Sequence, residues 1–472
     1  MIIGRKDELT KLRSALDSSK SEFVAVYGRR RIGKTFLIRQ AFGSFAFEHT
    51  GLRKRGTRKQ LEEFARAMSH QGYPGCRCPK DWYDAFDKLR DLLLGKGDGK
   101  KVVFLDECPW MDTAKSDFTG ALDHFWNGWA SARDDIVLVI CGSATSWVIA
   151  KVIDDYGGLH NRLTRQVYLR PFNLQECEEM CRAKGLVLNR DQILEGYMVM
   201  GGVPYYWDLL RKELSMAQNL DALFFAPHGE LADEFDHLFV ALFRKPEPYI
   251  AVIRALGTRN CGLSRDEIIS AAGLQGNGAL TKVLNELRQC DFIRVYSVPG
   301  KKKRDAIYQL IDNYTLFYFR FLDGRVNLMP DFWSVSRGTQ AVRVWCGLAF
   351  ERVALEHVDA IKRKLGISGV ITNLYGWRFV ADDGAQEGAQ IDLVIERNDQ
   401  VVNLCEMKHT AGPYEITDLY DRRLQIKRET FVRETGTAAA VHLTMVSAHG
   451  VKSNANAKDL QSVVTLDDLF DG

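Results

Sequence analysis

Apolar residues in the first third of the chain gather in short runs that are separated by amphipathic stretches. The runs at 23–28 (FVAVYG), 101–106 (KVVFLD) and 136–141 (IVLVIC) have the length of strands and few polar positions. Strands of this kind are typically buried on both faces, as in parallel sheets. The stretch at 36–42 (FLIRQAF) has a helical pattern instead. The pattern predicts an α/β domain with a parallel sheet over residues 1–170.

Downstream of this domain the pattern becomes helical and then mixed. Three helical stretches and the two strands FIRVYSV and AIYQLID predict a winged helix-turn-helix, in which Ser264 and Glu267 form a capping box. Because 472 residues are too many for one core, we expect several domains after the first. They are a helical lid at 171–238, the winged helix-turn-helix at 239–323, a linker at 324–340 and a second α/β domain at 341–472.

The residues after the first apolar run have the chemistry of a phosphate-binding loop. GRRRIGKT (28–35) matches Gly-x-x-x-x-Gly-Lys-[Ser/Thr] and stands between a predicted strand and a predicted helix. Gly28, Arg31 and Gly33 belong to the loop whose backbone N–H groups would surround phosphate oxygens. Lys34 would reach the β- and γ-phosphates, and Thr35 would offer its hydroxyl to Mg²⁺. The motif predicts an ATP site.

Polar residues also follow the second and third apolar runs. Asp106 would hold Mg²⁺ through water, and Glu107 has the position of a base that polarises the attacking water. Ser143 either senses the γ-phosphate or is an ordinary turn residue. Arg162 or Arg165 neutralises charge in the transition state, in cis or across a subunit interface, or belongs to a simple basic surface.

Charged residues also interrupt the predicted strands of the last domain, where a buried charge is unfavourable unless something compensates it. Glu406 and Lys408 lie two positions apart in VVNLCEMKH (401–409), and therefore on one face of a strand. Asp392 lies in the preceding strand and Glu351 in an amphipathic helix. The three acids would hold Mg²⁺, or Mn²⁺, and Lys408 would orient a water molecule or stabilise charge. For Glu406 and Lys408 alone, a salt-bridge ladder on an edge strand is the alternative.

This order of acids resembles that of the PD-(D/E)XK restriction-endonuclease-like nucleases. Further motifs, namely IIGRKDELTKL, VYGRRRIGKT, FLDECPWM, CGSATSW and GGVPYYW, resemble the archaeal-type ATPases on the AAA+/STAND side of the P-loop NTPases. The resemblance implies that residues 3–5 and Glu8 lie beside the nucleotide. It also implies an arginine finger or sensor near Arg162, although the family usually has Gly-Arg where this chain has Asn161-Arg162. Members often end in a PD-(D/E)XK-like (DUF234-type) domain.

Composition sets few limits on the partners. The net charge is +3, so the totals do not require a nucleic-acid partner, and any basic surface must be local. No apolar run has the roughly 20 residues of a membrane span, and the ten cysteines form neither a disulfide framework nor a zinc motif. These observations predict a cytoplasmic protein without a membrane partner.

The combined features predict an ATPase that forms a homo-oligomer and whose last domain cleaves double-stranded DNA, in genome defence or the handling of mobile DNA. The winged helix-turn-helix either contacts DNA or merely connects domains. In the first case a helix face and a basic turn would meet the DNA, namely Thr281, Lys282, Asn285, Arg288 and Lys301–Arg304. The alternative is a STAND-like signalling switch, in which the last domain binds a partner and does not cut.

Overall fold

The computed structural model describes residues 2–143, 145–153, 162–243, 245–260, 262–296, 306–325, 329–379 and 388–471. The chain divides into two compact units. Unit 1 comprises Met1–Pro171 and Leu238–Pro246, and unit 2 comprises Phe172–His237 and Glu247–Gly472. The segment predicted as a lid therefore groups with the C-terminal part of the chain.

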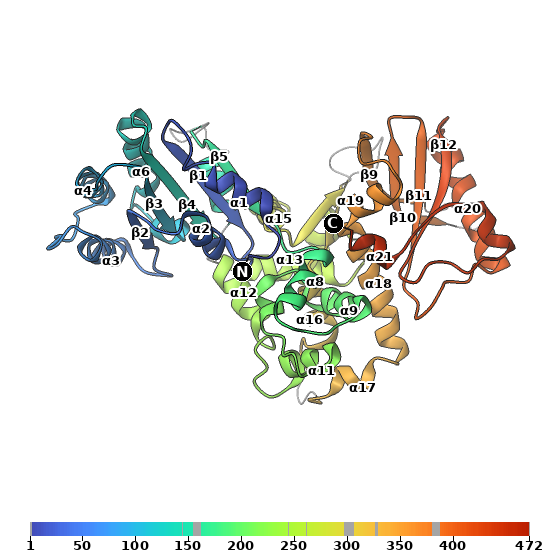
Figure 1. Cartoon of the computed structure of the whole chain (residues 1–472). Helices are drawn as coiled ribbons and strands as arrows, with labels where there is room; N and C mark the ends of the chain where they lie inside the picture. Colours follow the sequence, from blue (N-terminus) through green and yellow to red (C-terminus); the bar gives the residue numbers. More distant parts are fainter. Residues whose placement is uncertain are drawn as a thin grey trace. The chain divides into compact units, whose positions relative to one another are not determined.

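Unit 1 is built on a five-stranded parallel sheet with the order β2-β3-β4-β1-β5 (Figure 1). The strands are β1 (Glu22–Gly28), β2 (Phe47–Thr50), β3 (Lys101–Asp106), β4 (Ile136–Gly142) and β5 (Arg165–Leu169). The three apolar runs of the sequence form β1, β3 and β4, which are the three inner strands. The prediction of a parallel α/β domain is confirmed.

Helices cover both faces of this sheet, because alternate side chains of each strand point to opposite faces. Phe23 and Ala25 pack in a core with α3, α4 and α6, whereas Val24 and Val26 pack with α1 and α2. The helices are α1 (Lys6–Arg13), α2 (Lys34–Phe42), α3 (Thr57–His70), α4 (Trp82–Leu94), α5 (Cys108–Met111), α6 (Phe118–Gly128) and α7 (Thr145–Val148), with short turns at Ala130–Ala132 and Ile149–Ile153. With the phosphate-loop motif between β1 and α2, unit 1 has a P-loop NTPase fold.

The first part of unit 2 is helical. Its elements are α8 (Leu174–Ala183), α9 (Arg190–Met200), α10 (Pro204–Asp208), α11 (Met216–Leu220), a π-helical turn (Asp221–Phe225) and α12 (Glu234–Leu242), whose last residues belong to unit 1. Capping boxes open α8, α9 and α11, each with an Asn or Ser side chain bonded to the first turn.

Aromatic packing and a hydrogen bond join the segment predicted as a linker to the helices of unit 2, including a contact of Phe332 with Phe225 at 4.9 Å between ring centroids. The segment contains α17 (Phe332–Ser336), and Trp333 is buried. Its ring lies 5.3 Å from Phe317 of α16 (Asn313–Phe321) and 5.7 Å from Trp345, centroid to centroid. The Trp333 indole N–H donates to Glu195 at 2.9 Å. The described part of the linker is thus packed into the unit.

Three helices and a small antiparallel sheet follow at 247–310. They are α13 (Glu247–Gly257), α14 (Arg265–Ala272), α15 (Gly278–Gln289), β6 (Leu263–Ser264), β7 (Ile293–Tyr296) and β8 (Ile307–Leu310), with the strand order β6-β8-β7. The predicted capping box is confirmed, because Ser264 accepts from the N–H of Glu267 and the Glu267 carboxylate accepts from the N–H of Ser264.

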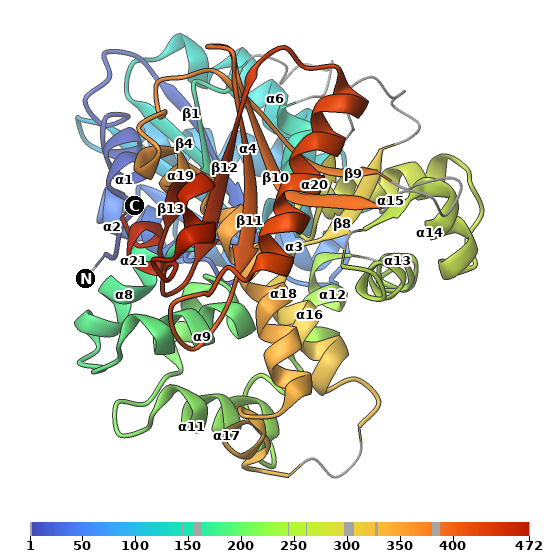
Figure 2. The ribbon, with the colours of Figure 1, turned by 90° about the vertical axis from the view of Figure 1, so that its right-hand side faces the viewer.

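The C-terminal domain has a mixed five-stranded sheet with the order β13-β12-β11-β10-β9, and α20 covers one face (Figure 2). Strands β9, β10 and β11 are antiparallel, whereas β11, β12 and β13 are parallel. The elements are α18 (Gln340–Glu356), α19 (Val358–Lys364), β9 (Thr372–Phe379), β10 (Ala389–Arg397), β11 (Val401–Lys408), α20 (Asp418–Thr435), β12 (Ala440–Ser447), a 3₁₀ turn (Ala455–Asp459), β13 (Leu460–Val464) and α21 (Leu466–Leu469).

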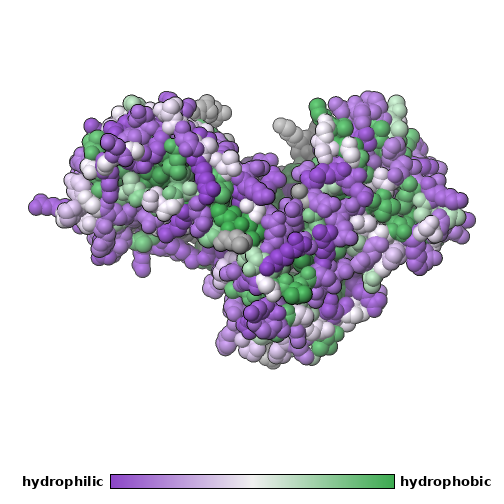
Figure 3. Space-filling view, in the orientation of Figure 1, coloured by the Kyte–Doolittle hydropathy of each residue, from purple (hydrophilic) through white to green (hydrophobic). Residues whose placement is uncertain are grey.

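Hydrophilic residues predominate on the surface drawn in Figure 3, with hydrophobic residues in smaller groups between them. Among the residues the structure describes, no helix is both long enough and apolar enough to cross a membrane. The nine cysteines in this part of the chain are free thiols.

A buried histidine gives unit 2 a predicted pH dependence. His357 Nε2 accepts from the N–H of Leu174 at 3.0 Å, and Nδ1 donates to the Val353 carbonyl at 2.7 Å, so the ring is neutral. Burial lowers the pKa of His357 from 6.5 to about 4. The unfolded chain then binds a proton in this window that the folded chain does not, and stability falls as the pH drops from 6.5 towards 4.

We expect His357→Leu to reduce this pH dependence and to lower the free energy of unfolding at pH 7.5 by about 1–3 kcal/mol, because the Leu174 N–H loses its acceptor. Denaturant unfolding of the full chain at several pH values measures both effects. His228→Asn, at an exposed position, is the control and leaves the profile unchanged. An unaltered profile in His357→Leu contradicts the assignment.

Candidate functional site

The phosphate-loop motif forms the connection between β1 and α2 in unit 1. Gly28 has φ 140°, and a Cβ there would lie 2.3 Å from the Leu169 carbonyl oxygen at the end of β5. Gly33 has φ 86° and precedes the first residue of α2. Arg31 also has a positive φ, 68°. These conformations explain why the loop has glycine at its ends, and they direct it around the start of a helix, where backbone N–H groups attract anions.

Lys34 lies inside this loop and is almost fully buried. Its ammonium donates to the carbonyl oxygens of Gly28 at 3.0 Å and Arg29 at 2.8 Å. An ammonium held by backbone carbonyls alone has no carboxylate to neutralise it within the loop. The charge is therefore available to a phosphate bound over the loop.

Thr35 and Asp106 meet beside the loop, because β1 and β3 end at the same edge of the parallel sheet. The Thr35 hydroxyl donates to Asp106 Oδ2 at 2.9 Å. A hydroxyl and a carboxylate are oxygen donors of the kind that Mg²⁺ prefers. The two side chains fit the predicted Mg²⁺ site.

Glu107 follows Asp106 in a strained conformation, with φ 51°. Its Oε2 accepts from the Ser143 hydroxyl at 2.9 Å and from the Ser143 N–H at 3.3 Å. Ser143 directly follows β4 and therefore stands at the same edge of the sheet. In this state Ser143 holds the predicted base, a contact that the sequence did not reveal.

The two arginines considered as fingers differ in their surroundings. Arg165 donates to Ser14 and to Glu22 Oε1, the latter at 3.2 Å, and so joins α1 to β1 and β5. Arg165 pairs with Val24 near the start of β1, at the edge opposite the phosphate loop. Arg162 is exposed and precedes β5, hence it lies at that opposite edge too. Along β1 this is about 20 Å from the loop, beyond the reach of an arginine side chain. Asn161 lies outside the described residues.

The amino-terminal residues implied by the resemblance are fixed close to β5. Arg5 is buried, has φ 57° and donates to the Arg170 carbonyl just after β5. It also pairs with Glu8 at 3.6 Å. Because β5 ends beside Gly28, the structure brings this segment to the edge of the sheet that carries the loop.

The predicted acids of the C-terminal domain stand on neighbouring strands. Leu393 of β10 pairs with Cys405 of β11, so Asp392 and Glu406 are adjacent across the same two strands. The pairing of β10 with β9 shifts register between Ile391 and Val394, which places Asp392 in a β-bulge. Bulges redirect side chains and are frequent next to active sites. The N–H of Met407 donates to Asp392 Oδ2 at 3.1 Å.

Glu406 is buried but has polar partners. Lys427 of α20 donates to Oε1 at 2.6 Å, and the Tyr420 hydroxyl donates to Oε2 at 3.2 Å. Lys408 lies farther away, with its Nζ 4.0 Å from Oε2. Lys427 is therefore the closer partner of Glu406, and β11 is the central strand of the sheet, so the pair does not belong to a ladder on an edge strand. Lys427 is thus engaged inside the domain.

The acids perturb one another. Burial, followed by the charge of Asp392, raises the pKa of Glu351 to about 7. Burial and Asp392 also raise the pKa of Glu406, against the opposing effect of Lys427. A cation beside Asp392 and Glu351 would relieve this repulsion, and their oxygen donors fit Mg²⁺ or Mn²⁺.

Glu406 fits such a site less well, because Lys427 and Tyr420 occupy both of its oxygens. Within the described residues, no three His, Cys, Asp or Glu side chains are grouped as the ligands of a metal ion. The predicted three-acid metal site therefore stays a prediction, and its best supported members are Asp392 and Glu351.

The helix face predicted to meet DNA is solvent-exposed in α15, where Thr281, Lys282, Asn285 and Arg288 are all exposed. This is compatible with either reading of the segment. The basic turn Lys301–Arg304 lies outside the described residues.

No family model matches. An uncharacterized protein of Methanocaldococcus jannaschii is 26% identical over 429 residues, covering 86% of this chain and 87% of that protein.

Three solved structures are similar to the chain at low identity. A Walker-type ATPase of Pyrococcus abyssi is 17% identical, with 68% of this chain and 96% of that one covered and a TM-score of 0.48. The ORC2 protein of Aeropyrum pernix is 13% identical, with 76% of this chain and 96% of that one covered and a TM-score of 0.41. A STAND protein with a tetratricopeptide repeat sensor from Pyrococcus horikoshii is 15% identical, with 78% of this chain and 56% of that one covered and a TM-score of 0.32. Likenesses this distant do not transfer a function, so the assignment rests on the residues themselves.

The ion pair inside the C-terminal domain gives a prediction for stability. Lys427→Met leaves the buried Glu406 with only the more distant Lys408, and we expect the free energy of unfolding to fall by about 3 kcal/mol at neutral pH. Adding Glu406→Gln should restore most of this loss, because no charge is then left unpaired. Urea unfolding of the full chain measures both.

The control is Lys452→Met, which breaks the pair with Glu415, where both side chains are more than half exposed, at 55% and 58%. Its expected effect is below about 0.5 kcal/mol. Equal effects of the two lysine substitutions would show that the Glu406 pair does not stabilise the domain.

Proposed function

We propose that this chain binds ATP with Mg²⁺ and hydrolyses it in unit 1, and that its C-terminal domain cleaves DNA. The observation that carries the first part is the convergence of Lys34, Thr35, Asp106 and Glu107 at one edge of the parallel sheet. No other edge of unit 1 combines a phosphate-binding loop with a hydroxyl and two carboxylates among the described residues.

The residues divide the work of hydrolysis. The loop N–H groups and Lys34 bind the β- and γ-phosphates, and Thr35 and Asp106 hold Mg²⁺. Bound there, Mg²⁺ supplies positive charge to the phosphate oxygens. Glu107 accepts a proton from the water that attacks the γ-phosphorus, the bond to the β-phosphate oxygen breaks, and ADP and phosphate result.

Ser143 regulates this step in the proposal. While its hydroxyl and N–H hold Glu107, the carboxylate is directed away from a water molecule. Bound ATP would compete for the Ser143 hydroxyl and free the base. Arg162, at the opposite edge of its own sheet, acts on the nucleotide of a second copy, which makes the active form a homo-oligomer.

Cleavage of DNA is the proposed activity of the C-terminal domain. The β-bulge at Asp392 supports it, because the bulge directs a carboxylate towards Glu351 instead of continuing the regular strand. Asp392 and Glu351 would hold Mg²⁺ or Mn²⁺, and Lys408 would bind a phosphate oxygen. The three helices and sheet at 247–310 would act as a winged helix-turn-helix that positions double-stranded DNA through α15.

A STAND-like switch is the second candidate, and the partners of Glu406 favour it. With Lys427 and Tyr420 on its oxygens, Glu406 is satisfied without a metal ion. The domain would then bind a partner and leave DNA intact.

Substitution of the base separates binding from hydrolysis. We expect Glu107→Gln to keep ATP affinity and to lower kcat by about 10²- to 10⁴-fold. Lys34→Ala should weaken binding as well, because it removes the cation of the loop. Phosphate release and binding of a fluorescent ATP analogue measure the two quantities. Lys59→Ala, at an exposed lysine of α3, is the control. A kcat of Glu107→Gln within a few-fold of wild type would exclude Glu107 as the base.

Cleavage of DNA is tested on supercoiled plasmid with Mg²⁺ or Mn²⁺, with and without ATP. We expect Asp392→Asn to lower the rate by at least about 10²-fold, because it removes a charged metal ligand. Asp399→Asn, in the exposed turn between β10 and β11, is the matched control. Intact plasmid under all conditions, with ATP hydrolysis preserved, supports the switch.

A further inference from the structure

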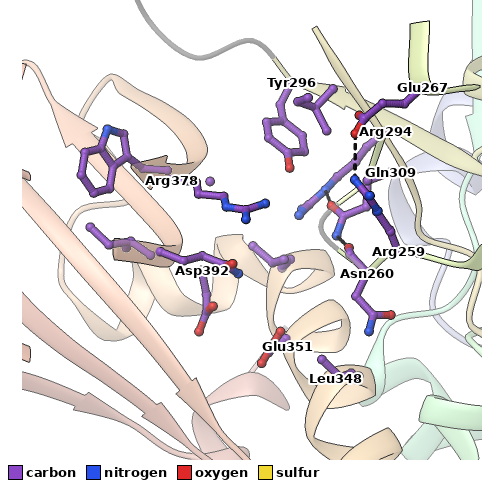
Figure 4. Close-up of a pocket in the computed structure, with 17 residues that line it drawn as sticks. Arg259, Asn260, Glu267, Arg294, Tyr296, Gln309, Leu348, Glu351, Arg378 and Asp392 are labelled. Atoms are coloured by element: carbon purple, nitrogen blue, oxygen red, sulfur yellow. Dashed lines mark hydrogen bonds and ion pairs between the residues drawn. The ribbon is translucent and has the colours of Figure 1, made fainter. Parts of the chain in front are cut away.

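A cavity of about 520 Å³ lies in unit 2 between the small sheet and the C-terminal domain. One wall comes from β7, β8 and the residues Arg259, Asn260 and Gly262, and the other from α18, β9 and β10 (Figure 4). The two walls approach each other closely, because a Cβ added to Gly376 of β9 would lie 4.0 Å from the ring of Tyr296 of β7. The cavity thus belongs to a single packed unit.

Arg294 is a largely buried cation on the wall formed by β7. Its Nε donates to Gln309 Oε1 at 2.6 Å, and its guanidinium lies 5.6 Å from the Tyr296 ring centroid. Gln309 is oriented by its own bond to the Asn260 carbonyl. No carboxylate of the described residues forms an ion pair with Arg294, and burial lowers its pKa. The charge of Glu356 acts on Arg294 without an ion pair, and a buried guanidinium in this state is stabilised further when an anion binds to it.

Arg378 provides a second cation from the opposite wall. It follows Gly376 on the same face of β9, since alternate residues of a strand share a face. Figure 4 shows its guanidinium extending into the cavity towards Arg294 and Tyr296. Arg378 forms no hydrogen bond or ion pair with another described residue. By contrast, Arg259 is paired with Glu267 at 2.7 Å.

The acids proposed for cleavage stand on the same cavity. Glu351 and Asp392 both line it, on the side of the C-terminal domain. Besides the Arg259–Glu267 pair, the cavity therefore has two cations, an aromatic ring and two carboxylates. A phosphate bound by the arginines would lie next to the acids, and a base could stack on Tyr296.

The size of the cavity limits what can bind. A volume of 520 Å³ is within the range of sites for small ligands, about 300–1,000 Å³, and corresponds to one nucleotide or slightly more. A volume that holds about one nucleotide cannot take a base pair together with both of its backbones, so double-stranded DNA does not fit. A strand can enter only where it is separated from its complement.

We propose that this cavity binds one nucleotide of a single DNA strand, with the phosphate between Arg294 and Arg378 and the base on Tyr296. Resting on the proposed nuclease function, this names the substrate class of the Asp392 site. The substrate is DNA with an unpaired segment, such as a flap, a gap or a frayed end. The winged helix-turn-helix would hold the adjoining duplex.

Binding of a labelled oligothymidine of about twelve nucleotides to the full chain, without divalent metal, tests the proposal by fluorescence anisotropy. We expect Arg294→Gln and Arg378→Gln each to weaken binding about tenfold or more, because each removes a charge-assisted contact to phosphate. Arg422→Gln is the matched control, with the same change of charge on the exposed face of α20. Binding of a blunt duplex should be unchanged in all three variants.

Gly376→Leu covers the case in which Arg294→Gln fails to fold. Its side chain would project from β9 into the cavity, and we expect it to weaken single-strand binding while retaining both arginines. Thermal unfolding verifies that each variant is folded. The proposal is overturned if the cavity variants that fold bind the oligothymidine as tightly as Arg422→Gln does. It is also overturned if these variants lose affinity for the blunt duplex as much as for the oligothymidine.

Cleavage of a flapped duplex with Mg²⁺ separates this proposal from the nuclease function. Asp392-dependent cuts within fully paired DNA at an unchanged rate in Arg378→Gln would leave the nuclease intact and overturn the single-strand cavity. An absence of cleavage, together with the expected losses of oligothymidine binding, would reject the nuclease and retain the cavity. Cuts confined to the unpaired segment, and reduced in Arg378→Gln, support both.

Discussion

The close approach of Gly28 to the end of β5 is the constraint on which the nucleotide site depends. A Cβ at this position would lie 2.3 Å from the Leu169 carbonyl oxygen, so no other residue fits without moving the strand. The chain then turns within a few residues from β1 into α2, which directs the loop N–H groups and Lys34 to one point. Because β3 and β4 are parallel to β1, the residues that follow them reach the same edge.

The acidic residues of the two candidate sites have different partners. In unit 1, Asp106 and Glu107 are held by hydroxyl groups, which a metal ion or a water molecule can replace at little electrostatic penalty. In the C-terminal domain, Lys427 already neutralises Glu406, and burial raises the pKa of Glu351. Binding of a metal ion there would require that Glu351 lose its proton and that its carboxylate hold the ion together with the carboxylate of Asp392. The second site is therefore only partly preorganised for a cation, and the cleavage assay decides whether it acts as a nuclease.

The sequence predicted the strands and the phosphate loop well, because a buried parallel strand is apolar throughout and the motif has a fixed position relative to it. It also identified Asp392, Glu406 and Lys408 as neighbours. It did not reveal the bulge at Asp392, the Ser143–Glu107 contact or the Lys427–Glu406 pair, because register and long-range pairing leave no local pattern. The sequence could not identify the role of Arg165 for the same reason. An arginine near a predicted site gives the same sequence pattern whether it binds a phosphate or, as here, Ser14 and Glu22.

Hydrogen–deuterium exchange of the full chain with and without ATP and Mg²⁺ tests the central claim most directly. Binding at the carboxyl edge of the sheet predicts slower exchange of the amides in 28–35, with a smaller change after β3 and β4. Lys34→Ala should abolish the protection. Exchange in 28–35 that ATP leaves unchanged, at a concentration that slows exchange elsewhere, would place the nucleotide at another site and contradict the account.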